Sequence, residues 1–161
     1  MGDLFQQVND DQDVIKNLLS KVPGFKGYIE RDNRRASDKI LRELVAQRYQ
    51  DEWKRVSSLQ RDLVNEGDLK NVGNLEAAAL KISQFSDRIK TASYGHSSFF
   101  EAVKINEEEL QTLYEYDSKL LQSADEIGRA IDNVSASIGS DGLPAAIRNL
   151  VAISQEAVDL F

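Results

Sequence analysis

Apolar residues recur at alternating intervals of three and four along most of this chain, which is the spacing of a buried helix face. The pattern is longest over residues 106–138, where it predicts one long helix. Asn106 and Glu109 have the spacing of a capping box, in which each side chain bonds to the backbone N–H of the other. Gly139 follows the last periodic residue and indicates the end of the helix.

The same spacing predicts four further helices on either side of that one. One long helix begins between Ile29 and Asp38 and ends near Asn65, another runs from Leu69 or Asn74 to Ala92, and shorter helices cover Asp11 to Lys21 and Leu143 to Phe161. Helices joined by short turns pack as antiparallel neighbours. The sequence therefore predicts an all-α fold: an antiparallel bundle of about five helices, three of them long, without strands.

Two stretches fall outside this pattern. Residues 25–29 are expected to form a hinge whose aromatic side chains cover one end of the bundle. Residues 93–105 are expected to be irregular and to fold across an end, because their aromatic and apolar side chains are too numerous for a free loop. Residues 1–10 are polar, and we expect them to be flexible.

Length and composition are those of one folded domain spanning residues 1–161. Apolar residues make up 41% of the chain and charged residues 29%. The absence of cysteine excludes disulfides, thiol catalysis and thiolate metal sites. No stretch has the composition of a signal peptide or approaches the ~20 apolar residues that cross a bilayer, so we expect a cytoplasmic protein.

The net charge of −7 is unevenly distributed. Residues 26–56 contain nine basic and six acidic side chains, whereas residues 106–141 contain two basic and nine acidic ones. Oppositely charged segments attract each other, so these two are expected to pack as neighbours. The acidic balance disfavours nucleic-acid binding, which requires clustered lysine and arginine.

Asp117 interrupts the apolar face of the helix predicted over residues 106–138. A buried carboxylate without a partner is strongly destabilising, so we expect a structural partner for it. The candidates are a cation from Arg88, Lys90 or Lys104 and a hydroxyl from Tyr28, Tyr94 or Tyr114. The alternative is a functional carboxylate, with a tyrosine, in an enzyme pocket at the end of the bundle.

Other catalytic and metal-binding motifs are missing. His96 is the only histidine, and the Gly95-His96-Ser97 sequence lacks the second glycine and the preceding strand of a hydrolase nucleophile elbow. A helical di-metal site requires histidines from facing helices, and no calcium loop, Walker loop or dinucleotide fingerprint is present. The sequence therefore predicts no metal, no cofactor and no enzymatic activity.

Five basic residues cluster near the start of the second predicted helix: Arg31, Arg34, Arg35, Lys39 and Arg42. On a helix, all of them except Arg34 share one face. We favour pairing of this strip with acidic residues of the same molecule. The alternative is peripheral binding to an anionic membrane surface, with Phe99 and Phe100 inserting beside the strip.

Several short motifs resemble those of an uncharacterised family of bacterial all-helical proteins. They are Pro23-Gly24-Phe25-x-Gly27-Tyr28, Arg31-Asp32-x-Arg34-Arg35, Ser93-Tyr94-Gly95, Phe99-Phe100-x-Ala102-Val103-Lys104-Ile105 and Leu113-Tyr114-x-Tyr116-Asp117. The resemblance covers residues 22–121, about two thirds of the chain. It implies a bacterial source and a helical fold, and it implies no particular activity.

These observations favour a non-enzymatic interaction or scaffold module that binds a protein partner or a second copy of itself. The starts of the second and fourth predicted helices and the end of the third are expected to share one end of the bundle. The candidate interaction surface at that end comprises Phe25, Tyr28, Arg31, Arg34, Arg35, Tyr94, His96, Phe99, Phe100, Lys104 and Asp117.

Overall fold

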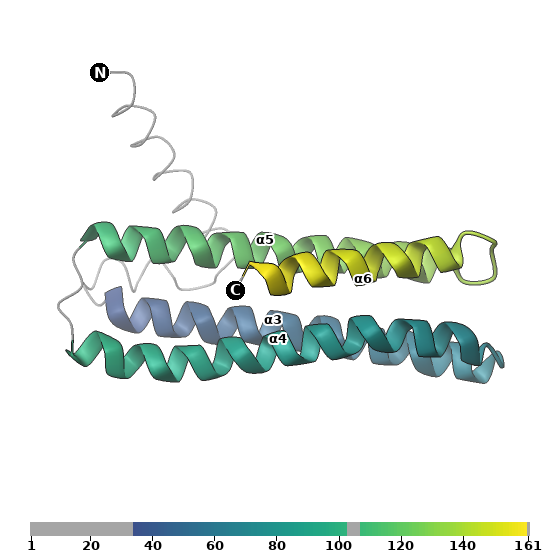
Figure 1. The fold of residues 1–161 in the computed structure, drawn as a ribbon, viewed down its shortest axis with the longest axis horizontal. Helices are drawn as coiled ribbons and strands as arrows, with labels where there is room; N and C mark the ends of the chain where they lie inside the picture. The colour runs from purple at the N-terminus through teal and green to yellow at the C-terminus, as the bar shows by residue number, and fades with distance from the viewer. Residues whose placement is uncertain (1–33, 103–106, 161) are drawn as a thin grey trace, which may run out of the picture. The chain divides into compact units, whose positions relative to one another are not determined.

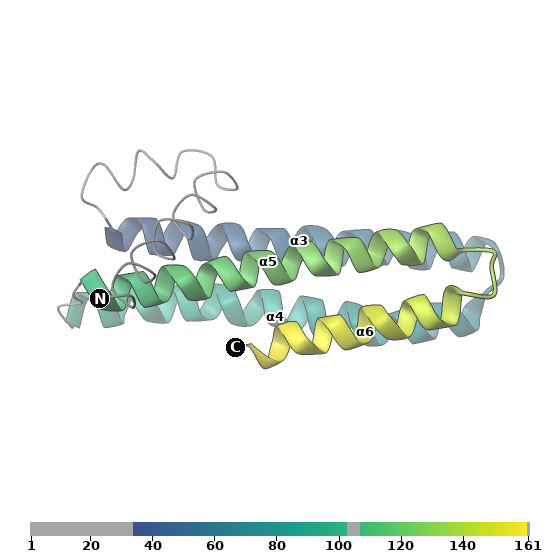
Figure 2. The same ribbon diagram turned by 90° about the horizontal axis from the view of Figure 1, so that it is seen from above.

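A computed structural model describes residues 34–102 and 107–160 of the chain. These residues form four helices and no strand: α3 (Arg34–Asn65), α4 (Leu69–Ala102), α5 (Glu107–Ser137) and α6 (Leu143–Asp159) (Figures 1 and 2). The prediction of an all-α fold with three long helices is confirmed for this part of the chain. The short helix predicted over residues 11–21, the hinge at 25–29 and the polar residues 1–10 lie outside the described residues, so four helices stand where five were expected.

The prediction of an irregular stretch over residues 93–105 is wrong as far as Ala102, because α4 continues through it. Gly95 is the only residue between Ser93 and Ala102 with a strongly unfavourable helix propensity. One glycine inside a helix costs only about 1 kcal/mol relative to alanine. That cost is too small to end a helix.

A tight turn at Glu66-Gly67-Asp68 joins α3 to α4. Gly67 adopts the left-handed conformation, with φ of 79°, and its N–H donates to the carbonyl of Val64 at 3.0 Å. The N–H of Asp68 donates to the carbonyl of Leu63 at 2.9 Å, which completes a Schellman motif. The Asp68 carboxylate then accepts the N–H of Asn71 at 3.2 Å, as an N-cap does. Asp68 therefore ends one helix and begins the next.

The chain divides into two compact units. Unit 1 comprises residues 1–44 and 90–119, and unit 2 comprises residues 45–89 and 120–161. The first unit contains the beginning of α3, the end of α4 and the beginning of α5. The second contains the remaining parts of these three helices together with α6.

Within unit 2, consecutive helices are antiparallel, whereas alternate helices lie side by side and run in the same direction. The hydroxyl of Ser86 on α4 donates to the carbonyl of Ala46 on α3, and Gln60 on α3 donates to the carbonyl of Val72 on α4, which fixes their antiparallel order. Arg48 and Arg55 of α3 pair with Asp125 and Asp132 of α5. Residue numbers rise in the same direction on both helices, so α3 and α5 are parallel. Unit 2 is thus two helical hairpins packed in the same direction, and the predicted antiparallel arrangement applies to consecutive helices only.

The core of unit 2 is apolar, and its residues recur at the intervals of three and four from which the helices were predicted. Its buried side chains include Val45, Tyr49, Val56, Leu63, Leu75, Ile82, Phe85, Ile89, Leu120, Ala124, Ile127, Ile131, Val134, Ile147 and Leu150. The rings of Tyr49 and Phe85 meet edge to face at 4.7 Å between centroids, and the Tyr49 hydroxyl donates to the Leu120 carbonyl at 2.9 Å.

Candidate functional site

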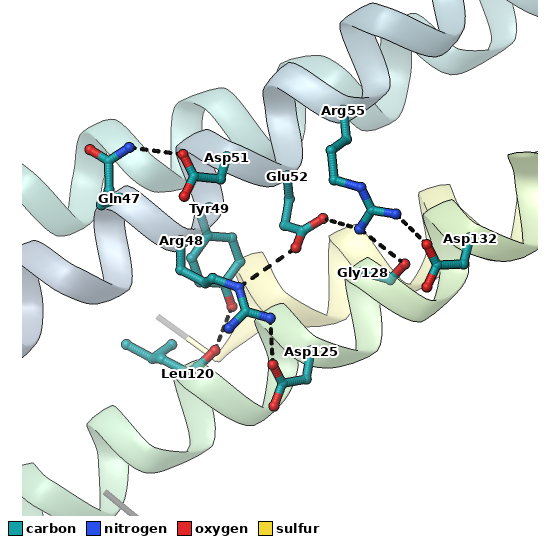
Figure 3. Close-up of polar contacts among 10 residues, drawn as sticks. All are labelled: Gln47, Arg48, Tyr49, Asp51, Glu52, Arg55, Leu120, Asp125, Gly128 and Asp132. Carbon is teal, nitrogen blue, oxygen red and sulfur yellow. Dashed lines mark hydrogen bonds and ion pairs between the residues drawn. The ribbon is translucent and has the colours of Figure 1, made fainter. Parts of the chain in front are cut away.

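Arginines of α3 and carboxylates of α5 form a charged seam in unit 2, made of Arg48, Glu52, Arg55, Asp125 and Asp132 (Figure 3). Arg48 Nη2 lies 2.6 Å from Asp125 Oδ1, and Arg55 Nη2 pairs with Asp132. The two arginines are seven residues apart, and so are the two aspartates, because that interval returns to the same face of a helix.

Glu52 lies between the two arginines of this seam. Its carboxylate is 3.6 Å from Arg48 Nε and 2.9 Å from Arg55 Nη1, and the residue is buried. Partial burial lowers the pKa of the Arg55 guanidinium, but its hydrogen bonds and charge interactions with Asp132 and Glu52 outweigh burial and raise the pKa overall. Each carboxylate in the seam therefore faces a cation, which is the arrangement of a structural ion-pair network.

Gly128 lets α5 approach this seam closely. A Cβ atom at this position would lie 3.1 Å from Glu52 Oε1 and 3.5 Å from Arg55 Nη1. The Gly128 carbonyl also accepts a hydrogen bond from Arg55 at 3.4 Å. The absence of a side chain at Gly128 thus leaves room for the buried carboxylate.

A buried ion pair joins the same two helices in unit 1. Arg42 Nε lies 2.5 Å from Asp117 Oδ1, and the two side chains are 2% and 0% exposed. Asp117 has an ionic partner, as predicted. Arg42 fills this role and was not among the predicted candidates Arg88, Lys90 and Lys104. Arg42 precedes buried Tyr49 and Val56 by seven and fourteen residues, a spacing that would have identified it as an inward-facing residue.

The predicted attraction between the basic and acidic segments is confirmed by these contacts. Arg42, Arg48 and Arg55 belong to the basic segment, and their partners Asp117, Asp125 and Asp132 belong to the acidic one. Arg42 points into the interior, so the basic strip that was the alternative membrane-binding face lacks one of its four members. Internal pairing, which the sequence favoured, holds for that residue.

Most of the predicted interaction surface belongs to parts of the chain that the structure describes incompletely. Phe25, Tyr28, Arg31 and Lys104 lie outside the described residues. Arg34 and Arg35 lie in the first turn of α3, and Tyr94, His96, Phe99 and Phe100 lie in the last turns of α4. Both helix portions belong to unit 1, together with the beginning of α5. This grouping agrees with the expectation that these three helix ends lie at the same end of the bundle. Asp117 is buried, so it does not contribute to an exposed surface.

A groove between α4 and α6 was not predicted from the sequence. It has a volume of about 490 Å³ and is lined by Gly73, Asn74, Ala77, Pro144, Ile147, Arg148 and Val151. Ile147 is buried at its floor, whereas five of the seven lining residues are exposed, so this α4–α6 groove is a surface feature. The signal for it in the sequence is the pair of small residues Gly73 and Ala77, one helical turn apart on α4.

The described residues contain neither a metal-binding cluster nor a membrane-spanning helix. Within residues 34–102 and 107–160, no three or more His, Cys, Asp or Glu side chains are placed to hold a metal ion. Over the same residues, no helix combines the length and the apolar composition needed to cross a bilayer.

Comparisons with known proteins give no match to this chain among protein-family models, curated proteins or solved structures. The resemblance to a bacterial helical family therefore stays a prediction. Function has to be inferred from the surfaces of the molecule itself.

Proposed function

We propose that this protein is a non-enzymatic interaction module that binds a protein partner through the outside of its helices. The observation that carries the proposal is the contrast between paired charges and exposed apolar residues in unit 2. The carboxylates of the charged seam face arginines, which is expected of groups that align helices. Leu69 and Leu80 of α4, in contrast, are 69% and 51% exposed.

Large apolar side chains on a surface favour a recognition role when they belong to one continuous apolar patch. Leu69 and Leu80 are eleven residues apart on α4, which is about three helical turns, so they lie on one face. Gly73 and Ala77 lie between them on that face and border the α4–α6 groove. Apolar grooves between helices are a common binding site for a helix of another protein.

The experiment that tests the proposal is surface cross-linking of the tagged full chain in its source cells, followed by mass spectrometry. We expect one protein, or a second copy of the chain, to be recovered reproducibly and to survive washing at physiological salt. Recovery of the uncross-linked monomer alone would contradict the proposal.

Co-sedimentation with anionic vesicles separates this function from membrane attachment. We expect the chain to remain in the supernatant at physiological salt. Sedimentation that is lost in the Arg34→Glu/Arg35→Glu variant and at high salt would instead support the membrane-binding alternative.

A further inference from the structure

We infer that the α4–α6 groove binds an acidic amphipathic helix of a partner protein. This inference rests on the proposed interaction function and specifies the face and the chemistry of its partner. The groove lies wholly within unit 2. The two helices that border it, α4 and α6, run in the same direction (Figure 2).

The shape of this surface fits a helix better than a small molecule. Small-molecule sites bury most of the ligand, whereas five of the seven residues that line the groove are exposed. Apolar surface also extends past the groove to Leu69 and Leu80, which are separated by about 16 Å along α4. An extended occupant of about three helical turns would cover both leucines and the groove between them.

Small residues on α4 allow the occupant to come close. Gly73 and Ala77 are one turn apart, and a Cβ added at Gly73 would meet no atom within 4 Å. On the other wall, Pro144 and Val151 of α6 present apolar atoms above the buried Ile147 side chain. The contact face of the occupant should therefore carry alanine and leucine residues.

The charges around the groove select an acidic occupant. Arg148 is the only charged residue that lines it. Asn74, Ala77 and Lys81 follow Lys70 on α4 by four, seven and eleven residues. These intervals place both lysines on the same face of α4 as the groove residues Asn74 and Ala77. Lys81 donates to Gln155 of α6 at 2.5 Å, one turn beyond the groove.

None of the nearby carboxylates lines the groove. Glu76 accepts a hydrogen bond from Gln60 of α3, and Asp159 accepts one from Gln155. Asp141 lies in the turn before α6 and does not line the groove. The groove is thus a basic, apolar face on a protein whose net charge is −7.

A pair of synthetic peptides tests the inference directly. The probe is an 18-residue helical peptide with leucine and alanine on one face and glutamate beside it, and the control peptide has lysine at every glutamate. Fluorescence anisotropy at low ionic strength measures binding to the full chain. We expect the acidic peptide to bind at least tenfold more tightly than the basic one, and its binding to weaken as salt is added.

Three variants locate the binding face. Ala77→Glu and Arg148→Glu should each weaken binding of the acidic peptide at least tenfold. Ala136→Glu, at an exposed position of α5 outside the groove, should change it less than twofold. All three positions are exposed on helices, and glutamate is a good helix former, so circular dichroism and melting should verify that each variant is folded.

Several results would overturn the inference. These are no binding of the acidic peptide, equal binding of the two peptides, or equal weakening by Ala77→Glu and Ala136→Glu. A wild-type dimer that Ala77→Glu converts to a monomer would identify a second copy of the chain as the occupant. If the cross-linking experiment recovers the same protein with Ala77→Glu as with the wild type, the groove inference fails while the interaction function stands.

Discussion

Two of the arginine–aspartate ion pairs that join α3 to α5, Arg48–Asp125 in unit 2 and Arg42–Asp117 in unit 1, differ most in burial. The Arg48 and Asp125 side chains in unit 2 are 40% and 25% exposed and lie beside an apolar core. The Arg42 and Asp117 side chains in unit 1 are almost completely buried and occupy core positions themselves. Water screens the first pair, whereas the second is removed from water and depends on its partner. The same attraction therefore aligns helices at a partly exposed seam in unit 2 and holds two buried side chains together in unit 1.

Removing one partner of the buried pair should have the largest effect. Asp117→Ala leaves the Arg42 guanidinium in a buried site without this carboxylate, so the free energy of unfolding should fall by roughly 3–5 kcal/mol. Urea denaturation followed by circular dichroism measures the loss. The double variant Arg42→Met/Asp117→Leu should recover most of it, because two apolar side chains need no charge compensation. A loss below about 1 kcal/mol for the single variant would refute the distinction between the units.

The next largest effect is expected at the polar contact inside the apolar core of unit 2. Tyr49→Phe keeps the ring contact with Phe85 but removes the hydrogen bond to the Leu120 carbonyl. The free energy of unfolding should fall by about 0.5–1.5 kcal/mol. Phe85→Leu serves as the matched control, since it alters the ring contact and keeps the hydroxyl. An unchanged stability of Tyr49→Phe would mean that the hydroxyl adds nothing to the α3–α5 contact.

The exposed pair of the charged seam should contribute less. A double-mutant cycle with Arg48→Ala and Asp125→Ala should give a coupling free energy of about 0.2–1 kcal/mol. The coupling should shrink in 0.5 M salt, because screening acts on partly exposed charges. The same cycle on the buried Arg42–Asp117 pair provides the comparison. If the two coupling free energies are equal, burial does not explain the difference between the two ion pairs.

Gly128→Ala should have the smallest net effect, because two contributions oppose each other. Alanine favours the helix by about 1 kcal/mol over glycine, but its Cβ would displace the Glu52 carboxylate, which two arginines hold. Gly73→Ala is the matched control, since open space surrounds that position on α4. Thermal melting should show that Gly73→Ala stabilises the protein more than Gly128→Ala does. The reverse order would indicate that Glu52 moves aside freely.

The helical faces of unit 2 could be predicted from the sequence because apolar residues at helical spacing have one way to be buried. The end of α3 was equally predictable, since Gly67 and Asp68 serve a turn that few other residues can form. The end of α4 was not, because a single glycine at position 95 weakens a helix without ending it. Local sequence thus determined the faces and the turn.

The polar contacts were only partly predictable, because charge balance identifies neighbouring segments but not individual partners. Asp117 was recognised as a residue that needs a cation, and the basic strip containing Arg42 was expected to pair within the molecule, but Arg42 was not identified as the partner of Asp117. Its position seven residues before Tyr49 carried the correct information. The α4–α6 groove depends on which helices become neighbours, and periodicity within a single helix does not specify that.

The double role of Asp68 makes the hairpin of α3 and α4 intolerant of changes in length. No spare residue separates the last bond of one helix from the first bond of the next. An inserted amino acid would rotate α4 by about 100° about its axis and carry Leu75 and Ile82 away from their positions in the interior. The number of residues in the turn therefore sets the register between α3 and α4, independently of the side-chain packing between them.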